Sequence, residues 1–317
     1  MGIVALYLDK LNAHMENMLL ERCSDEIDVR FLQPTTGKKG ELEDADIFIV
    51  TTFQVTKEII DQAPRLRLIQ RTGIGVDMVD VEYARQRGIP VSVCRGFNTT
   101  SVAELAVLNM LALYRKIVTM DVLTKKGEWH TWTFRHESYE MVGKTIGVLG
   151  VGNIGRKVIE LVEAFHVNVI YYDVNRLSAE EENRLGITYK SLAEVICQGD
   201  IITLHLPLLP QTKGIIGRDQ LKAMKKTSIL VDTSRDLLID LDALVDALNE
   251  GEISGAAIDI FDPITAASPL FRARECNLIL TPHIGAATFD NYDRVYRLCA
   301  SNAIRILHGQ KPEMTLS

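Results

Sequence analysis

Three glycines at positions 150, 152 and 155, in the stretch VLGVGNIGRKV, have the spacing of a dinucleotide-binding loop. An apolar run that predicts a strand precedes them, and a periodicity that predicts a helix follows. Gly150 would permit a tight turn, Gly152 would let the backbone approach a pyrophosphate, and Gly155 would let helix and strand pack closely. The sequence therefore predicts that this loop binds the phosphates of a dinucleotide.

A second apolar run ends on Asp173, which follows Gly150 by 23 residues, close to the roughly 20 expected for the acid that binds the adenosine ribose. Its charge would repel a 2′-phosphate, so NAD is favoured over NADP. The N–H groups at the helix start, including those of Asn153 and Ile154, would bind the pyrophosphate. We expect no metal site, because the histidines and cysteines show no metal-ligand spacing.

Three other stretches follow predicted strands: ILVDTSRD, GAAIDIFDP and LTPHIGAAT. Arg235 offers a two-pronged donor that suits a carboxylate, and His283 can exchange a proton near neutral pH. Together they suggest hydride transfer on a 2-oxo or 2-hydroxy acid. Each alone has an ordinary alternative, namely an arginine in a surface ion pair and a histidine satisfied in the core.

The elements that would position these residues alternate between short β-branched runs and helical patterns, which predicts an α/β fold with parallel sheets. The runs fall into two series, each of which reads as its own array of strands and helices. The expected strands are 3–8, 29–32, 47–51, 68–71 and 91–93 in the first series, and 146–149, 169–172, 201–204, 229–231, 256–260 and 278–280 in the second.

Composition narrows the class of protein. A chain of 317 residues that is 47% hydrophobic can bury a large core, and two domains are more probable than one at this length. The net charge of −7, without a basic stripe, argues against nucleic acid or an anionic membrane as a partner. No apolar segment reaches a membrane-spanning length, and the five scattered cysteines suit free thiols in a reducing cytoplasm.

The ordered motifs RTGIGVDMVD, GFNTTSVAE, GVLGVGNIG, HLPLLPQTKGIIG, VDTSRD and TPHIGAAT give the chain a resemblance to the D-isomer-specific 2-hydroxyacid dehydrogenases, which include phosphoglycerate dehydrogenase and the hydroxypyruvate/glyoxylate reductases. The resemblance implies two Rossmann-like domains. A flavodoxin-like substrate domain, residues 1–100 and 288–317, would surround an inserted NAD-binding domain, residues 101–287. It also implies a homodimer with Trp129 and Trp132 near the partner.

The same resemblance implies roles for individual residues. Arg235 would orient the carboxylate and carbonyl of a small 2-oxo or 2-hydroxy acid, and His283 would be the acid/base. Backbone amides of the segment around Gly73, at Ile74, Gly75 and Val76, would bind the substrate carboxylate. Asp259 would hold the nicotinamide carboxamide, and the remaining cofactor contacts would come from Leu206, Pro207, Thr233, Ser234, Arg235, His283 and Gly285.

The sequence departs from the family pattern at its acid/base pair. The family's catalytic Glu lies five residues after the acid equivalent to Asp259, and here that position is Ile264. Without a carboxylate partner, the pKa of His283 should fall. We hypothesise that Asp262 fills the role, although a solvated turn residue before a proline is the commoner case.

A second departure lies next to the catalytic arginine. Asp232 and Asp236 stand where the family has Asn and Gly, and Asp236 would oppose an anionic substrate tail if it faced the cleft. Two function classes stay open: an NAD-dependent D-2-hydroxyacid dehydrogenase, or an NAD(H)-responsive binding or regulatory protein with little turnover. Arg235 and His283 favour the enzyme, because a pure binder needs neither.

Overall fold

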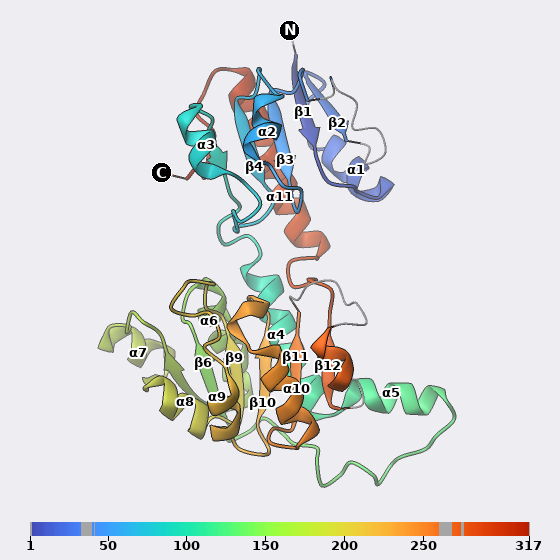
Figure 1. Cartoon of the computed structure of the whole chain (residues 1–317), viewed down its shortest axis with the longest axis vertical. Coiled ribbons are helices and arrows are strands. Elements are labelled where there is room, and N and C mark those ends of the chain that lie inside the picture. The colour runs from blue at the N-terminus through green and yellow to red at the C-terminus, as the bar shows by residue number, and fades with distance from the viewer. Residues whose placement is uncertain (1, 33–39, 41, 260–267, 274–275, 317) are drawn as a thin grey trace. The chain divides into compact units, whose positions relative to one another are not determined.

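The computed structural model describes residues 2–32, 40, 42–259, 268–273 and 276–316. The chain divides into two compact units, Met1–Asn98 with Thr288–Ser317, and Thr99–Ala287. Each unit holds one parallel sheet with helices on both faces (Figure 1). The predicted fold class, α/β with two parallel sheets, is therefore confirmed.

The first unit holds five strands in the order β2-β1-β3-β4-β5, which is the flavodoxin-like doubly wound order. In this order the loops after β1 and β3 lie at the topological switch point, where open α/β sheets bind ligands. The elements are β1 (Ile3–Tyr7), α1 (Ala13–Leu20), β2 (Ile27–Phe31), β3 (Ile47–Val50), α2 (Lys57–Asp61), β4 (Leu68–Arg71), α3 (Val81–Gln86), β5 (Val91–Ser92) and α11 (Phe289–Leu307).

Alternate side chains of these strands enter two separate cores. Ala5, Tyr7 and Ile49 pack with residues of α1 and α11. Leu6 and Phe48 pack with residues of α2 and α3 on the other face. Because both faces are covered, the inner strands β1 and β3 read as continuous apolar runs, whereas the edge strand β2 alternates between buried and exposed residues.

The second unit holds seven strands in the order β12-β11-β10-β9-β6-β7-β8, which is the Rossmann order with one further strand at the β12 edge. The elements are α4 (Thr99–Tyr114), α5 (Ile117–Lys125), β6 (Thr145–Leu149), α6 (Asn153–Val162), η1 (Glu163–Phe165), β7 (Asn168–Tyr172), α7 (Ala179–Leu185), β8 (Ile187–Tyr189), α8 (Leu192–Gln198), β9 (Ile201–Leu204), α9 (Arg218–Ala223), β10 (Ile229–Asp232), η2 (Asp236–Leu238), α10 (Leu241–Asn249), β11 (Gly255–Ile258), η3 (Pro269–Ala273) and β12 (Leu278–Leu280).

The sheet of the second unit is also buried on both faces. Val148, Tyr171 and Val231 pack with α4 and α6, whereas Ile202 and Leu230 pack with α8, α9 and α10. The switch point lies between β6 and β9, which are neighbours in the sheet. The glycine loop after β6 is therefore at the edge where a ligand is expected.

One strand of the second unit was not predicted. β8 has only three residues, of which Ile187 alone is buried, and it pairs with β7 at the edge of the sheet. An edge strand this short leaves no apolar run in the sequence, so the pattern of buried strands could not indicate it.

Candidate active site

The loop between β6 and α6 is built around its glycines. Gly150 has a φ of +97°, and a Cβ there would lie 2.7 Å from the carbonyl oxygen of His205. A Cβ on Gly155 would lie 2.0 Å from the carbonyl oxygen of Gly150. Around a Cβ on Gly152, in contrast, there is open space. Two glycines thus serve the packing of the loop, and the third leaves room for a ligand.

The amino end of α6 has no side-chain cap. Gly152 is the N-cap residue, and it makes no side-chain hydrogen bond to the first turn, which contains the predicted phosphate-binding residues Asn153 and Ile154. The first N–H groups of a helix have no partner within the helix, and they attract anions. This end of α6 therefore fits the pyrophosphate of a dinucleotide.

Asp173 lies directly after β7 and holds the same loop. Its Oδ2 accepts a hydrogen bond from the N–H of Val151 at 2.9 Å, and its Oδ1 accepts one from the N–H of Asn175 at 3.0 Å. The Nε of Arg156 donates to the carbonyl oxygen of Val151 at 2.9 Å. A carboxylate offers about four acceptor positions, so Asp173 keeps capacity for the ribose hydroxyls.

The segment after β9 contacts the glycine loop. Leu206 is buried and Pro207 is exposed, and the backbone of His205 and Leu206 approaches Gly150. The Nε2 of His205 lies 3.0 Å from the Oγ1 of Thr203. Burial lowers the pKa of His205 to about 3. His205 is therefore neutral at physiological pH and does not exchange protons there.

The turn after β10 presents Arg235. Asp232 accepts hydrogen bonds from the N–H of Ser234 at 2.7 Å and from its hydroxyl at 2.5 Å. Thr233 is 5% exposed, and its Oγ1 has no hydrogen-bond partner in the part of the chain that the structure describes. A buried hydroxyl left unpaired costs about 1–3 kcal/mol. The unpaired Oγ1 fits the prediction that Thr233 contacts a bound cofactor.

Asp259, directly after β11, organises the loop that carries His283. Its carboxylate accepts hydrogen bonds from the hydroxyl of Thr281 at 2.6 Å and from the N–H groups of Ile284 and Gly285 at 2.8 Å each. Its carbonyl oxygen accepts one from the N–H of His283 at 2.7 Å. The sequence suggested only a contact with the carboxamide, so this positioning of the histidine loop is an additional role.

His283 has a φ of 55°, a left-handed conformation that is uncommon outside glycine. Its pKa lies below the usual value, because desolvation and the positive charge of Arg235 lower it more than the carboxylate of Asp259 raises it. Arg235 is thus one of the two charged residues of the described ranges that act on the imidazole. Burial is the largest of these causes, so the shift does not test the effect of the isoleucine at position 264.

Two residues of the sequence argument cannot be placed. Asp262, the hypothesised partner of His283, and Ile264 lie outside the described residues. Among the residues that are described, Asp259 is the acid whose charge acts on His283.

In the first unit, the loop after β4 contains the predicted carboxylate-binding residues. The N–H groups of Ile74, Gly75 and Val76 donate to no other residue within the described ranges. A run of free backbone amides can bind an anion. The loop is therefore suited to the predicted role.

Sequence reasoning missed two charged residues that hold this region. Arg71 donates to the carbonyl oxygens of Gly75 and Thr51. Asp9 accepts hydrogen bonds from the N–H groups of residues 51–53. Each follows or ends a predicted strand, and that position at the ligand-binding edge was the available signal.

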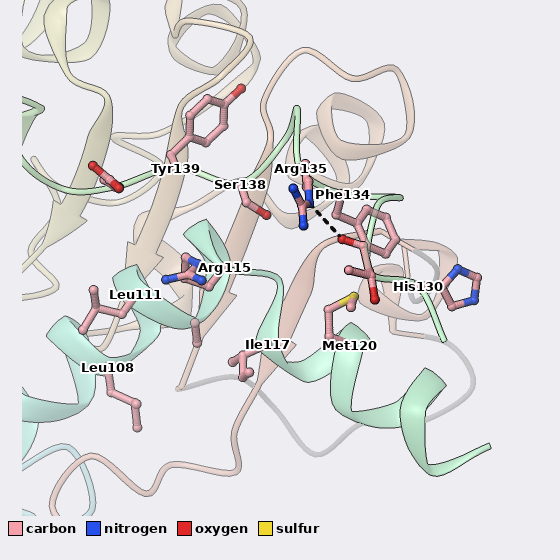
Figure 2. Close-up of a pocket in the computed structure, with 13 residues that line it drawn as sticks. Leu108, Leu111, Arg115, Ile117, Met120, His130, Phe134, Arg135, Ser138 and Tyr139 are labelled. Atoms are coloured by element: carbon pink, nitrogen blue, oxygen red, sulfur yellow. Dashed lines mark hydrogen bonds between the residues drawn. The ribbon is translucent and has the colours of Figure 1, made fainter. Parts of the chain in front are cut away.

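A separate groove of about 880 Å³ lies on the second unit between α4, α5 and residues 130–140. Figure 2 shows Leu108, Ile117, Met120 and Phe134 among the side chains that line it. Nearby, Trp129 and Trp132 are 84% and 74% exposed. Exposed apolar patches of this kind mark interaction surfaces.

No group of three or more His, Cys, Asp or Glu residues within the described ranges could hold a metal ion. In the same ranges, every helix is too short or too polar to cross a bilayer.

Comparison with known proteins identifies the family of the chain. Residues 107–285 match the family model of the D-isomer specific 2-hydroxyacid dehydrogenase, NAD binding domain. The chain is 37% identical to the glyoxylate reductase of Aeropyrum pernix over 275 residues, 84% of this chain and 81% of that protein. It is 38% identical to the D-3-phosphoglycerate dehydrogenase of Methanocaldococcus jannaschii over 86% of this chain, but it spans only 52% of that protein.

A solved structure extends the likeness to the whole fold. The D-lactate dehydrogenase of Aquifex aeolicus, complexed with NAD and lactic acid, matches with a TM-score of 0.81 and 26% identity, over 96% of each chain. The glycine loop, the uncapped end of α6 and Asp173 fit the NAD that this family binds. The chain therefore belongs to the D-isomer-specific 2-hydroxyacid dehydrogenase family and is an NAD-dependent oxidoreductase.

Proposed function

We propose that this enzyme interconverts a small 2-oxo acid and the D-2-hydroxy acid, with Arg235 orienting the substrate and His283 as acid/base. The observation that carries the proposal is the electrostatic effect of Arg235 on His283. The two residues come from different loops of the second unit, at the carboxyl ends of its strands, and the charge of Arg235 acts on the pKa of His283.

The chemistry follows from the two side chains. In the reductive direction, the hydride for the carbonyl carbon would come from NADH, when it is bound. Arg235 stabilises the negative charge that develops on the carbonyl oxygen, and protonated His283 gives that oxygen its proton. In the reverse direction, neutral His283 removes the hydroxyl proton. The lowered pKa makes the neutral form dominant at physiological pH.

We expect the acid to be small and unphosphorylated. The predicted site for its carboxylate is the run of free amides at residues 74–76, and Arg71 links this loop to Thr51. The adjoining segment Thr51–Gln54 has no basic side chain that could pair with a phosphate. Glyoxylate fits such a site, and relatives of the chain are named glyoxylate reductases.

The experiment is an NADH oxidation assay with glyoxylate, pyruvate, hydroxypyruvate and 3-phosphohydroxypyruvate. We expect turnover of an unphosphorylated acid, with a loss of about 100-fold or more in His283→Gln. His308→Gln is the matched control, because no role is assigned to His308. Turnover that survives in His283→Gln, or a preference for the phosphorylated acid, would contradict the proposal.

The second candidate, an NAD(H)-responsive binding protein with little turnover, is favoured by one observation, the isoleucine at position 264. The same assay separates the two candidates. NADH binding in a titration without oxidation by any acid of the panel would favour the binding protein.

We also infer that two copies of the chain associate through the groove of Figure 2. The face carries an apolar groove and, beside it, the exposed side chains of Trp129 and Trp132. A two-fold interface brings the same patch of both copies together, so each copy can offer tryptophans to the groove of the other. This arrangement supports the homodimer that the family resemblance implies.

The compartment remains a prediction. The five cysteines are free thiols, and free thiols are the rule in a reducing cytoplasm. We therefore propose a cytoplasmic enzyme.

A further inference from the structure

Arg71, at the end of β4, links two loops of the first unit. Its side chain is buried, with 7% of the residue exposed. The Nε donates to the carbonyl oxygen of Gly75 at 2.9 Å. The Nη1 donates to the carbonyl oxygens of Thr51 at 2.5 Å and Val50 at 3.2 Å. One guanidinium thus ties the end of β3 to the loop with the free amides.

The hydrogen-bond partners of Arg71 carry no negative charge. Within the described ranges, no carboxylate lies within ion-pair distance of its guanidinium, which donates to carbonyl oxygens only. Burial lowers the pKa of Arg71, and the carboxylates of Asp9 and Asp77 oppose this at longer range. A buried cation of this kind is costly unless an anion approaches it.

The other side of the link is rigid as well. Asp9 accepts hydrogen bonds from the N–H groups of Thr51 and Thr52 at 2.6 Å and of Phe53 at 2.8 Å. These bonds join the loop after β1 to the loop after β3. The carbonyl oxygen of Thr51 is therefore a fixed acceptor for the guanidinium.

The backbone of Arg71 is held from the opposite direction. Its carbonyl oxygen accepts hydrogen bonds from the Nε2 of Gln70 at 2.8 Å and from the Sγ of Cys94 at 3.3 Å. The Oε1 of Gln70 accepts one from the Nδ2 of buried Asn302 at 2.7 Å. Both ends of Arg71 are thus constrained, so its guanidinium has little freedom to follow a ligand.

We propose that Arg71 is a positioning residue for the substrate carboxylate. It holds the loop so that the N–H groups of Ile74, Gly75 and Val76 stay free, and its guanidinium places a buried positive charge beside them. The proposal rests on the function proposed above. It assigns a role in substrate binding to a side chain that itself contacts only protein carbonyl groups in the structure.

The test compares Arg71→Lys, which keeps the charge but not the forked donor, with Arg71→Gln, which removes the charge. Arg67→Gln is the matched control, because Arg67 begins the same segment and its Nη2 donates to the carbonyl oxygen of Ile306 at 2.6 Å. The readouts are KM for the 2-oxo acid, KM for NADH and kcat.

We expect Arg71→Gln to raise KM for the 2-oxo acid about 10- to 100-fold, the range for a lost charge-assisted interaction. KM for NADH should stay within about twofold, since the cofactor-binding residues belong to the other unit. Arg71→Lys should show a smaller rise, and Arg67→Gln none. If Arg71→Gln does not fold, the comparison of Arg71→Lys with Arg67→Gln decides alone.

A neutral substrate analogue separates two effects of Arg71, its charge and its influence on the conformation of the loop. The ratio of kcat/KM for the acid to that for its amide should fall in Arg71→Gln and stay constant in Arg67→Gln. An unchanged KM for the acid in both Arg71 variants would overturn the proposal. If the unaltered enzyme turns over no acid, the proposed function fails, and calorimetry of oxalate binding to Arg71→Gln and the unaltered protein still tests the role of Arg71.

Discussion

The α-carbon of Gly155 faces the carbonyl oxygen of Gly150, so closely that a Cβ would lie 2.0 Å from that oxygen. The contact joins the first turn of α6 to the end of β6. Gly152 lies between the two in sequence, yet its surroundings are open. The glycines of one motif therefore have separable purposes, one for packing and one for ligand access.

Alanine substitutions can separate these purposes. Gly155→Ala should destabilise the protein by about 1–3 kcal/mol or more, because the added Cβ must displace backbone. Gly152→Ala should leave the free energy of unfolding unchanged within about 0.5 kcal/mol but weaken NADH binding about tenfold, because the Cβ occupies space needed by the pyrophosphate. Denaturant unfolding and NADH titration measure the two effects. Unaltered NADH affinity in a folded Gly152→Ala would argue against this phosphate site.

Asp173 is expected to select NADH over NADPH through its charge. Asp173→Asn keeps an oxygen that can accept the hydrogen bond from Val151 but removes the repulsion of a 2′-phosphate. The ratio of kcat/KM for NADPH to that for NADH should rise about tenfold or more. Asp200→Asn is the control, because Asp200 also accepts a backbone hydrogen bond, from Thr145 at 2.8 Å. Asp200 precedes β9, so it lies at the amino ends of the strands, away from the ends where the cofactor is expected. An equal rise in both variants would point to a non-specific charge effect.

The lowered pKa of His283 sets the pH dependence of both reaction directions. Reduction needs the protonated imidazole, so kcat/KM for the 2-oxo acid should fall as pH rises through a midpoint below the usual value of about 6.5. Oxidation needs the neutral imidazole, so kcat/KM for the hydroxy acid should rise through the same midpoint. Initial rates between about pH 5 and pH 8 test this. A midpoint above the usual value would mean that a carboxylate dominates the surroundings of His283.

If two copies associate through the groove, a charged side chain placed in it should prevent dimer formation. Ile117→Asp introduces a carboxylate into the apolar groove, and light scattering should show the mass of one chain where the unaltered protein shows that of two. Leu20→Asp is the control, because Leu20 is an exposed apolar residue of α1 in the other unit. Dimers that persist in Ile117→Asp would exclude this face as the interface.

Both sheets could be predicted from the sequence, because parallel strands buried on both faces leave continuous apolar runs. The glycine motif and Asp173 were recognisable for a similar reason, since their spacing lies within one short βαβ segment. The hydrogen bonds that Arg71 and Asp9 make with the backbone of Thr51 could not be predicted, because they join residues about twenty and forty positions apart. Such contacts depend on which strands become neighbours in the sheet, and the local sequence pattern does not indicate the strand order.

The route of the chain through the first unit has a consequence for synthesis on the ribosome. The core of that unit includes Val295, Tyr296 and Cys299 of α11, packed against Tyr7 of β1. Residues 99–287 are translated before α11, so all parts of the second unit emerge while the first still lacks a wall of its core. The apolar surface of the N-terminal strands therefore stays uncovered until α11 is made, and such surface favours aggregation during translation.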